Sequence, residues 1–354
     1  MNHNTKAQNV IQVKKEGIII SKTDLVFESD SVLNPATIKV NDDLYLFYRA
    51  VQKGNFSSIG LCKLSGPLTV AERYVQPVLS PLLDIESQGM EDPRVVQIDD
   101  LYYLTYTAYD GVNAMGALAT SANLVDFTRH GIIVPVFSFT EFKNRAERSG
   151  ALNEKYGRYA HDHIQIRKGK KVLLWDKDVV FFPRRINGQL YFLHRIKPDI
   201  QIVAINELAD LTKAFWNNYC DHFSDHIVLA PKHDHEVSYI GSGCPPVETD
   251  QGWLVIYHGV HDTTTGYVYS ACAALLDLNN PKIEIARLPY PLFAPGTAWE
   301  LNGVVDSVCF PSGTALYEDT LYIYYGAADS SVACASVSLR SLLNELLKFK
   351  IDKP

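Results

Sequence analysis

The stretch DPRVVQIDDLYYLTYTAY, Asp92–Tyr109, places a short apolar run after a proline, then an Asp-Asp turn, then a run rich in aromatic residues. Two such runs joined by a turn are typical of a β-hairpin. Four other stretches repeat the pattern: NPATIKVNDDLYLFYRAV from Asn34, FPRRINGQLYFLHRI from Phe182, PPVETDQGWLVIYHGV from Pro245 and FPSGTALYEDTLYIYYGAA from Phe310. The chain therefore contains one kind of hairpin five times.

The spacing of these hairpins predicts the fold. With Pro35, Pro93, Pro183, Pro246 and Pro311 as register marks, the hairpins recur about every 60 residues, and the second gap is roughly 30 residues longer. A unit of that length holds the four strands of a propeller blade, and radial closure protects the strand edges. A β-sandwich is the alternative, but the regular period argues against it. We predict an all-β fold in which residues 1–354 form a single domain, a five-bladed β-propeller.

Two segments depart from the strand pattern. Residues 137–171 are polar and rich in charges of both signs, which indicates a long insertion between blades two and three, mostly loop with a helical turn. Long ordered loops on propellers often shape the binding face. Near the end of the chain, SLRSLLNELLKFKI has the i, i+3, i+4 leucine spacing of an amphipathic helix over about 338–350.

The composition excludes several classes of protein. Hydrophobic residues make up 47% and charged residues 21%, the balance of an ordinary globular protein with a large core. The net charge is -7 and the 33 Lys and Arg residues are scattered, so we expect no nucleic-acid partner. No run approaches the roughly 18 apolar residues of a membrane span. The first ten residues lack the apolar core of a secretory signal, which predicts a cytoplasmic protein, or a periplasmic one if a signal has been trimmed.

Cysteine and histidine usage gives no sign of a cofactor. The six cysteines never form a C-x-x-C pair and lie in apolar runs, so we expect buried free thiols. The triplet HDH occurs twice, at 161–163 and 233–235, but no third ligand follows at a zinc-site spacing. We predict neither a metal nor another cofactor, and the sequence leaves the oligomeric state open, a homo-oligomer included.

Polar residues recur at matching places in the hairpins. In a propeller the first strand of each blade lines the central channel, so equivalent positions converge on one pocket. Any one of them could be a turn cap, but carboxylates, basic groups and aromatic faces together suit the cleavage of a sugar linkage. Near the start of the hairpins stand Asn34, Asp92, Asp178 and Glu236, and at the ends of the aromatic strands stand Arg49, Asp110, Arg195, His258 and Asp329.

Four motifs in order resemble one family. GMEDPRV, DKDVVFFPRRINGQLYFLHR, GSGCPPVETDQGWLVIYHG and VCFPSGTALYEDTLYIYYGAAD are similar to motifs of glycoside hydrolase family 130, the β-mannoside phosphorylases and β-1,2-mannosidases, which are five-bladed propellers. The resemblance runs from about Asn34 to about Asp329. It implies that Asp92 is the general acid, that the proton travels through the mannose 3-hydroxyl, and that the anomeric centre inverts.

The same resemblance implies further site residues. Asp329 looks like the aspartate that holds the sugar, and Arg49 and Arg94 look like its supporting basic residues. Phosphorylases of the family bind inorganic phosphate in a basic cluster, and three residues here match it. These are Lys177, Arg195 and His258. We expect the rest of the substrate site to contain Asn34, Glu91, Asp110, Asp178 and Tyr239.

One position departs from the phosphorylase pattern. The chain reads YIGSGCPP, which puts Tyr239 where the family phosphorylases have a lysine. A neutral phenol there removes a charge-assisted hydrogen bond worth roughly 1.5–3 kcal/mol from a phosphate site. Asp178 and Glu236 add negative charge, which suits the activation of a water molecule.

These residues predict an inverting exo-hydrolase of β-1,2-linked mannose, with Asp92 as acid and Glu236 as base. Two alternatives stay open. One is a β-mannoside phosphorylase that releases mannose 1-phosphate, with Lys177, Arg195 and His258 holding the phosphate. The other is a non-catalytic propeller that binds mannan. In each case the expected partner is a β-mannoside oligosaccharide, and inorganic phosphate is a partner only of the phosphorylase.

Overall fold

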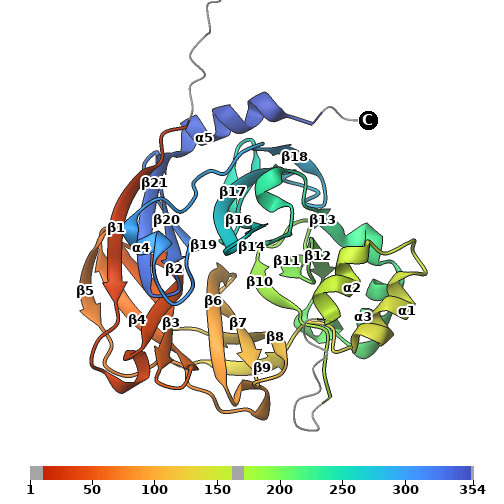
Figure 1. Cartoon of the computed structure of the whole chain (residues 1–354), viewed down its shortest axis with the longest axis horizontal. Coiled ribbons are helices and arrows are strands. Elements are labelled where there is room, and N and C mark those ends of the chain that lie inside the picture. The colour runs from red at the N-terminus through yellow and green to blue at the C-terminus, as the bar shows by residue number, and fades with distance from the viewer. Residues whose placement is uncertain (1–10, 162–170, 352–354) are drawn as a thin grey trace, which may run out of the picture.

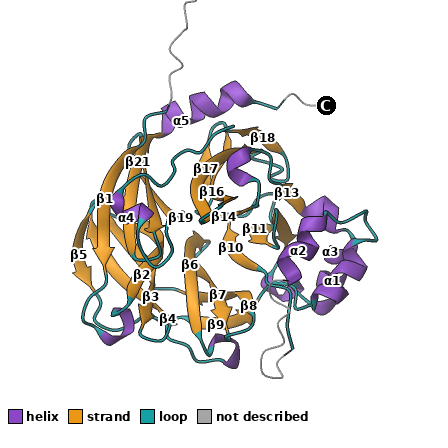
Figure 2. Ribbon diagram, in the orientation of Figure 1, coloured by secondary structure: helices purple, strands orange, loops and turns teal. Residues whose placement is uncertain are grey.

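The structure is a computed structural model that describes residues 11–161 and 171–351. It is an all-β protein with a few helices on its periphery (Figure 2). None of the helices in these two ranges is long and apolar enough to cross a membrane. The described cysteines are all buried free thiols, as the sequence predicted.

The strands pair in antiparallel groups of four that follow one another around a common centre (Figure 1). Within each group, neighbouring strands in the chain are hydrogen-bonded neighbours in space. A single parallel pairing, Ser57 with Gly89, joins the first two groups into one eight-stranded sheet. The first group contains β2 (Ser31–Val40), β3 (Asp43–Gln52), β4 (Phe56–Ser65) and β5 (Thr69–Arg73), and the second contains β6 (Gly89–Ile98), β7 (Leu101–Tyr109), β8 (Ala114–Ser121) and β9 (Thr128–Ile132).

The next two groups have the same plan. In the fourth group a short additional strand, β15 (Val247–Thr249), also pairs with β16. The third group contains β10 (Lys177–Phe181), β11 (Leu190–Arg195), β12 (Ile200–Ile205) and β13 (Ile227–Leu229), and the fourth contains β14 (Tyr239–Ser242), β16 (Gly252–Thr263), β17 (Gly266–Leu276) and β18 (Glu284–Arg287).

The fifth group is built from both ends of the described chain. Its first three strands are β19 (Cys309–Tyr317), β20 (Thr320–Ala327) and β21 (Ser331–Ser338). Its outermost strand is β1 (Lys14–Ser21), which pairs antiparallel with β21 from Lys14 opposite Ser336 to Ser21 opposite Ser331. The groups pack through apolar faces, and the buried side chains form clusters between neighbouring groups.

The predicted hairpins lie at the inner side of the groups, but two register marks are displaced. Pro35, Pro93 and Pro311 lie inside β2, β6 and β19, each at a β-bulge. Pro183 and Pro246 instead follow the ends of β10 and β14. The reason is that proline has no N–H for the ladder, so it is accommodated either at a bulge or beyond a strand end.

The insertion is more helical than expected. It contains α1 (Phe139–Ala146) and α2 (Glu154–His161), while residues 162–170 of the predicted 137–171 segment lie outside the described residues. Ser138 caps α1 by accepting from the Glu141 backbone N–H, and the Glu141 carboxylate accepts from Ser138. Arg145 of α1 pairs at 2.9 Å with Asp221 of α3 (Lys213–Asp221), a helix that the sequence did not predict.

The helix near the end of the chain is confirmed. It forms α5 (Leu339–Leu346) and continues as a 3-10 turn over Leu347–Phe349. Ser338 caps its start by accepting from the Ser341 backbone N–H. The short helix α4 (Ala298–Leu301) follows the fourth group in the chain and lies beside β1 and β20 of the fifth (Figure 1).

Candidate active site

Three innermost strands carry an Asx residue in the left-handed backbone region. Asn34, Asp92 and Asp178 have φ values of 48°, 51° and 55°, and each lies at a β-bulge of β2, β6 or β10. Asn and Asp tolerate this conformation better than other residues with a side chain, and a bulge redirects the side chain. Asn34 Nδ2 donates to Asp92 Oδ1 at 2.7 Å, so the first two groups meet at this point. The predicted equivalence of these three positions is thus visible in the backbone.

Arg49 at the end of β3 lies between two carboxylates. Its Nη2 donates to Glu91 Oε1 at 2.8 Å and its Nε donates to Ser57 Oγ at 2.8 Å. Its Nη1 lies 3.6 Å from Asp92 Oδ1. Glu91 and Ser57 therefore hold the guanidinium beside the carboxylate predicted to be the acid.

The two central aspartates titrate differently. Burial raises the pKa of Asp329 to about 6, against the opposing effect of Arg49, and the charge of Asp92 adds to the rise. Burial acts in the same direction on Asp92, but the charges of Arg49 and Lys177 and the hydrogen bond from Asn34 outweigh it and lower the pKa of Asp92. In the unliganded site Asp92 is therefore ionised, and Asp329 is the carboxyl that takes up a proton first as the pH falls.

Arg195 and His258 meet at Asp178. Arg195 Nε lies 2.9 Å from Asp178 Oδ2, and Arg195 Nη1 lies 3.4 Å from His258 Nε2. The His258 ring packs 4.4 Å from the ring of Phe310. Burial, reinforced by the charge of Arg195, lowers the pKa of His258 well below its usual value. His258 is therefore neutral near pH 7 and can bond a ligand, but it adds no positive charge.

A pocket opens beside these residues. Its water-accessible volume is about 20 Å³. Lys177 and Arg195 stand opposite each other in the β10–β11 ladder, and Lys197 follows two residues later. Lys197 lies in the turn that follows β11, and its place in the pocket was not predicted from the sequence. The lining residues are Tyr156, Tyr159, Leu174, Trp175, Lys177, Arg195 and Lys197.

The insertion supplies one wall of this pocket. Tyr156 and Tyr159 both belong to α2. Tyr159 Oη donates to the Ser238 carbonyl at 2.6 Å, and the Tyr156 hydroxyl donates to the buried carboxyl group of Asp199. The insertion therefore lines a pocket of its own chain.

Tyr239 on β14 forms the floor beneath the cations. It is buried, and its hydroxyl shares a 2.5 Å hydrogen bond with that of Tyr269. The Lys197 ammonium lies 3.8 Å from the centre of the Tyr239 ring, and the Arg195 guanidinium lies 5.4 Å from it. Two positive charges thus stand over the residue whose neutrality was expected to weaken a phosphate site.

Glu236 is not placed to activate water. It ends a short 3-10 turn, Asp234–Glu236, and is fully buried. One carboxylate oxygen accepts from the Tyr257 hydroxyl, and the other accepts from two backbone N–H groups and lies 3.3 Å from Arg287 Nη1. The prediction that Glu236 is the general base therefore has no support in its geometry, because both oxygens are already bonded.

Three other glutamates share this arrangement. In each case a glutamate at or near the end of a short helical turn before a group accepts from a tyrosine hydroxyl on the second strand and pairs with a cation on the outermost strand. The four turn glutamates and their partners are Glu28 with Tyr48 and Arg73, Glu86 with Tyr106 and Arg129, Glu236 with Tyr257 and Arg287, and Glu300 with Tyr325 and Lys15. The repetition identifies Glu236 as part of a structural network.

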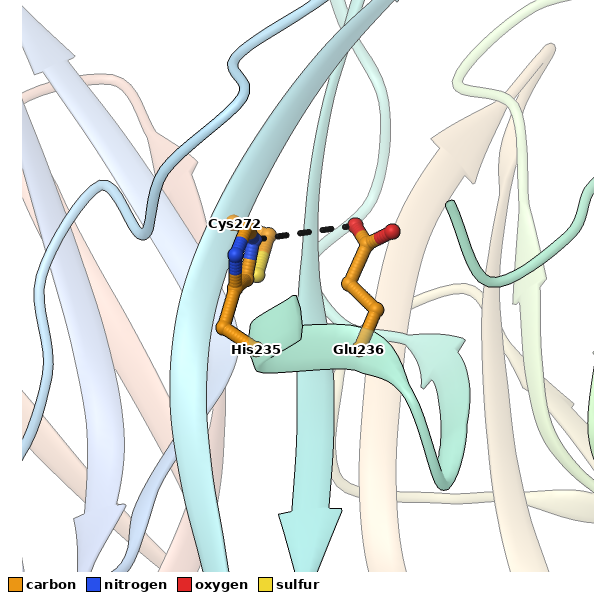
Figure 3. Close-up of side chains that lie close together, drawn as sticks. All are labelled: His235, Glu236 and Cys272. Atoms are coloured by element: carbon orange, nitrogen blue, oxygen red, sulfur yellow. Dashed lines mark ion pairs between the residues drawn. The ribbon is translucent and has the colours of Figure 1, made fainter. Parts of the chain in front are cut away.

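Figure 3 shows that His235 and Cys272 also approach Glu236, with ligand atoms within 4.8 Å of one another. A metal there would compete with Tyr257 and Arg287 for the carboxylate. Burial also raises the pKa of Cys272 well above its usual value, which keeps the thiol protonated and a poor ligand. The trio does not have the chemistry of a metal site.

Two predicted substrate residues are bonded to backbone instead. Arg94 is almost fully buried and donates to the carbonyls of Asp92, Pro93, Ser242 and Gly243, so it ties β6 to the end of β14. Asp110 accepts from the backbone N–H groups of residues 112 and 113 in the β7–β8 turn. Arg94 supports the site from below, and Asp110 has the geometry of a turn cap.

The centre of the molecule keeps unsatisfied polar atoms. Buried polar groups are nearly always hydrogen-bonded, so a concentration of open ones indicates a place for a polar ligand. Among the described residues, the buried polar atoms without a hydrogen-bond partner include these on the first two strands of their groups: Asn34 Oδ1, Asp178 Oδ1, Ser242 Oγ, His258 Nδ1 and Ser312 Oγ.

Comparisons with known proteins find relatives along nearly the whole chain. The family model described as beta-1,4-mannooligosaccharide phosphorylase matches residues 5–348. A 1,2-beta-oligomannan phosphorylase of Thermoanaerobacter is 31% identical over 335 residues, which is 92% of this chain and 96% of the relative. A beta-1,2-mannobiose phosphorylase of the same organism is 32% identical over 327 residues, 88% of this chain and 91% of the relative.

Among solved structures, the beta-1,2-mannobiose phosphorylase from Listeria innocua in complex with beta-1,2-mannobiose has the same fold. Its TM-score is 0.71 at 22% identity, and the alignment covers 95% of this chain and 99% of that one. The match of the family model over nearly the whole chain is the decisive finding. The chain belongs to glycoside hydrolase family 130, a family of glycoside-processing enzymes.

Proposed function

We propose that this protein is a β-mannoside phosphorylase that cleaves β-1,2-linked mannose with inorganic phosphate and releases mannose 1-phosphate. The observation that carries the proposal is the cluster of Lys177, Arg195 and Lys197 in one pocket beside Asp92 and Asp329. Three cations suit a phosphate dianion, whereas a hydrolase needs only a base and a water molecule. The β-1,2 linkage is supported by the names of the two Thermoanaerobacter relatives.

The hydrolase expectation depended on two residues, and neither favours it now. Tyr239 stands where the family phosphorylases have a lysine, but the Lys197 ammonium lies 3.8 Å from the centre of the Tyr239 ring. Glu236 was the expected base, but it belongs to the turn glutamates. In this proposal the five strand groups are the blades of one propeller domain, and the inner ends of β2, β6 and β10 surround the reacting sugar.

Asp92 is the general acid in this proposal. A phosphate oxygen attacks the anomeric carbon while the bond from that carbon to the leaving oxygen breaks, and the proton of Asp92 reaches the leaving oxygen. Attack from the opposite face inverts the anomeric centre. Phosphate bound at Lys177 offsets one of the charges that lower the pKa of Asp92, so phosphate favours the protonated acid that the step requires.

Incubation of the protein with β-1,2-mannobiose, with and without inorganic phosphate, tests the proposal. We expect mannose 1-phosphate and mannose in equal amounts, and turnover that rises with phosphate. Free mannose alone, at a rate that phosphate does not change, would establish a hydrolase. Intact substrate under both conditions would indicate a non-catalytic protein that binds mannan.

A further inference from the structure

Lys197 has no assigned role, and its surroundings are unusual for a lysine. It follows β11 by two residues and is only partly exposed. Its Nζ lies 3.8 Å from the centre of the Tyr239 ring and 5.5 Å from the centre of the Tyr159 ring. The face of an aromatic ring attracts a cation within about 6 Å, so two rings from different parts of the fold fix this ammonium group.

The platform below Lys197 is itself fixed. Tyr239 packs edge-on against Tyr159, with ring centres 5.5 Å apart, and its hydroxyl is bonded to Tyr269. Burial raises the pKa of Tyr239 well above its usual value, so the phenol does not become a competing anion. The ring therefore positions a charge without neutralising it.

Lys197 also changes the number of charges in the pocket. His258 is neutral near pH 7, which leaves Lys177 and Arg195 as the cations that the sequence analysis had expected to face phosphate. Arg195 is partly neutralised by Asp178 at 2.9 Å. A dianion needs more positive charge than this pair provides, and Lys197 lines the same cavity.

We propose that Lys197, held on the rings of Tyr239 and Tyr159, is a phosphate-binding residue that supplies the positive charge absent from position 239. This inference rests on the proposed function and adds a residue to it. Because Tyr159 belongs to α2, the insertion takes part in phosphate binding as well.

The test compares Lys197→Met with Lys197→Arg, which keeps the charge, and with Lys39→Met as a matched control. Lys39 also stands over a tyrosine ring, at 4.4 Å from Tyr317, but on an exposed part of β2. For each protein the KM for inorganic phosphate and the KM for β-1,2-mannobiose are measured, together with phosphate binding by calorimetry and the thermal melting temperature.

We expect Lys197→Met to raise the KM for phosphate roughly ten- to a hundredfold, the loss of one charge-assisted hydrogen bond, with little change in the KM for mannobiose. Lys197→Arg should retain most of the affinity, and Lys39→Met should match the wild type. Adding Tyr239→Lys to Lys197→Met should recover part of the loss, because an ammonium group returns to the same place.

Separate outcomes contradict the two proposals. If the wild type makes mannose 1-phosphate and Lys197→Met has an unchanged KM for phosphate, the role of Lys197 is refuted while the phosphorylase stands. If the wild type makes only mannose, the phosphorylase is refuted, and calorimetry decides on Lys197. Phosphate binding that is lost in Lys197→Met would then still support its role, and no phosphate binding by the wild type would overturn it.

Discussion

Two sets of buried carboxylates, the turn glutamates and the aspartates at the centre, differ in how many of their oxygens accept hydrogen bonds. The turn glutamates accept hydrogen bonds on both oxygens, one of them from a tyrosine hydroxyl, and each also pairs with a cation. In Glu86, Glu236 and Glu300 the second oxygen accepts from backbone N–H groups. At the centre, Asp92 has one hydrogen bond from Asn34, and Asp178 keeps an oxygen without a partner among the described residues. Burial is similar in the two sets, so the open bonding capacity distinguishes a reactive carboxylate from a structural one.

The second strands of two groups, β3 and β16, supply partners to both sets of carboxylates. Tyr48 bonds Glu28 while its neighbour Arg49 faces Asp92, and Tyr257 bonds Glu236 while its neighbour His258 faces Asp178. Successive side chains of a strand point to opposite faces. Adjacent residues of one strand therefore contact the structural network on one face and the site on the other.

The largest effect is expected from Asp92→Asn. Asparagine accepts the left-handed backbone and keeps the hydrogen bond from Asn34, but it cannot deliver a proton, so turnover should fall by about 10²–10⁴-fold with the fold intact. Steady-state kinetics with β-1,2-mannobiose and phosphate, and a thermal melt, measure the two effects. Near wild-type turnover in this variant would show that Asp92 only supports the β-bulge of β6 and is not the general acid.

Glu236→Gln should show the opposite pattern. Arg287 keeps its ion pair with Glu284 but loses the second carboxylate in a fully buried place, and two backbone N–H groups lose a charged acceptor, which should lower the free energy of unfolding by about 1–3 kcal/mol. The folded protein should keep its kcat. Urea denaturation gives the stability, and Glu248→Gln, in a half-exposed pair with Arg184, is the control expected to cost about 0–1 kcal/mol. Loss of kcat at unchanged stability would restore Glu236 as a base.

Asp199 is a buried carboxyl group that contacts the insertion, because it accepts a hydrogen bond from the Tyr156 hydroxyl of α2. Burial raises the pKa of Asp199 to about 6. A raised pKa gives stability that is present below the pKa of the unfolded chain and is lost as the pH rises through about 6. Between pH 4 and 7 the wild type should lose up to about 3 kcal/mol relative to Asp199→Asn, which does not titrate. Urea unfolding of both proteins across this range checks it, and parallel curves would contradict it.

The smallest effect is expected at Asp110. Its side chain accepts from two backbone N–H groups of a partly buried turn, so Asp110→Ala should cost about 1 kcal/mol of stability. The KM values for mannobiose and phosphate should stay unchanged. A large increase in the KM for mannobiose would return Asp110 to the substrate site.

The sequence alone predicted the hairpins well because their pattern is local. Alternating apolar runs and Asp-Asp or Asn-Gly turns are properties of a few neighbouring residues, and they recur in every group. Helix α3 was missed although its buried residues, Trp216, Tyr219 and Cys220, have the i, i+3, i+4 spacing of an amphipathic helix; they pack in the same cluster as the insertion.

The site was predicted less well because it depends on neighbours that are distant in sequence. The meeting of Asp92 and Arg49 at the centre could be inferred from their places in the hairpins, and Lys177 was expected there from the family resemblance. The ion pair of Glu236 with Arg287, 51 residues away, could not be inferred from the sequence, and neither could the position of Lys197 above the Tyr239 ring. Spacing gives the order of residues, whereas the contacts that assign a role arise from packing between groups.

The pairing of β1 with β21 has a consequence for how the molecule is made. Lys15 of β1 is the cation of Glu300, a residue 285 positions later in the chain. During synthesis β1 emerges first and stays an unpaired edge until β21 has left the ribosome, and Glu300 has no cation until β1 docks. Contacts of such sequence separation form slowly. The fifth group is therefore expected to be completed late in folding, since its outermost strand is distant in sequence from its other three.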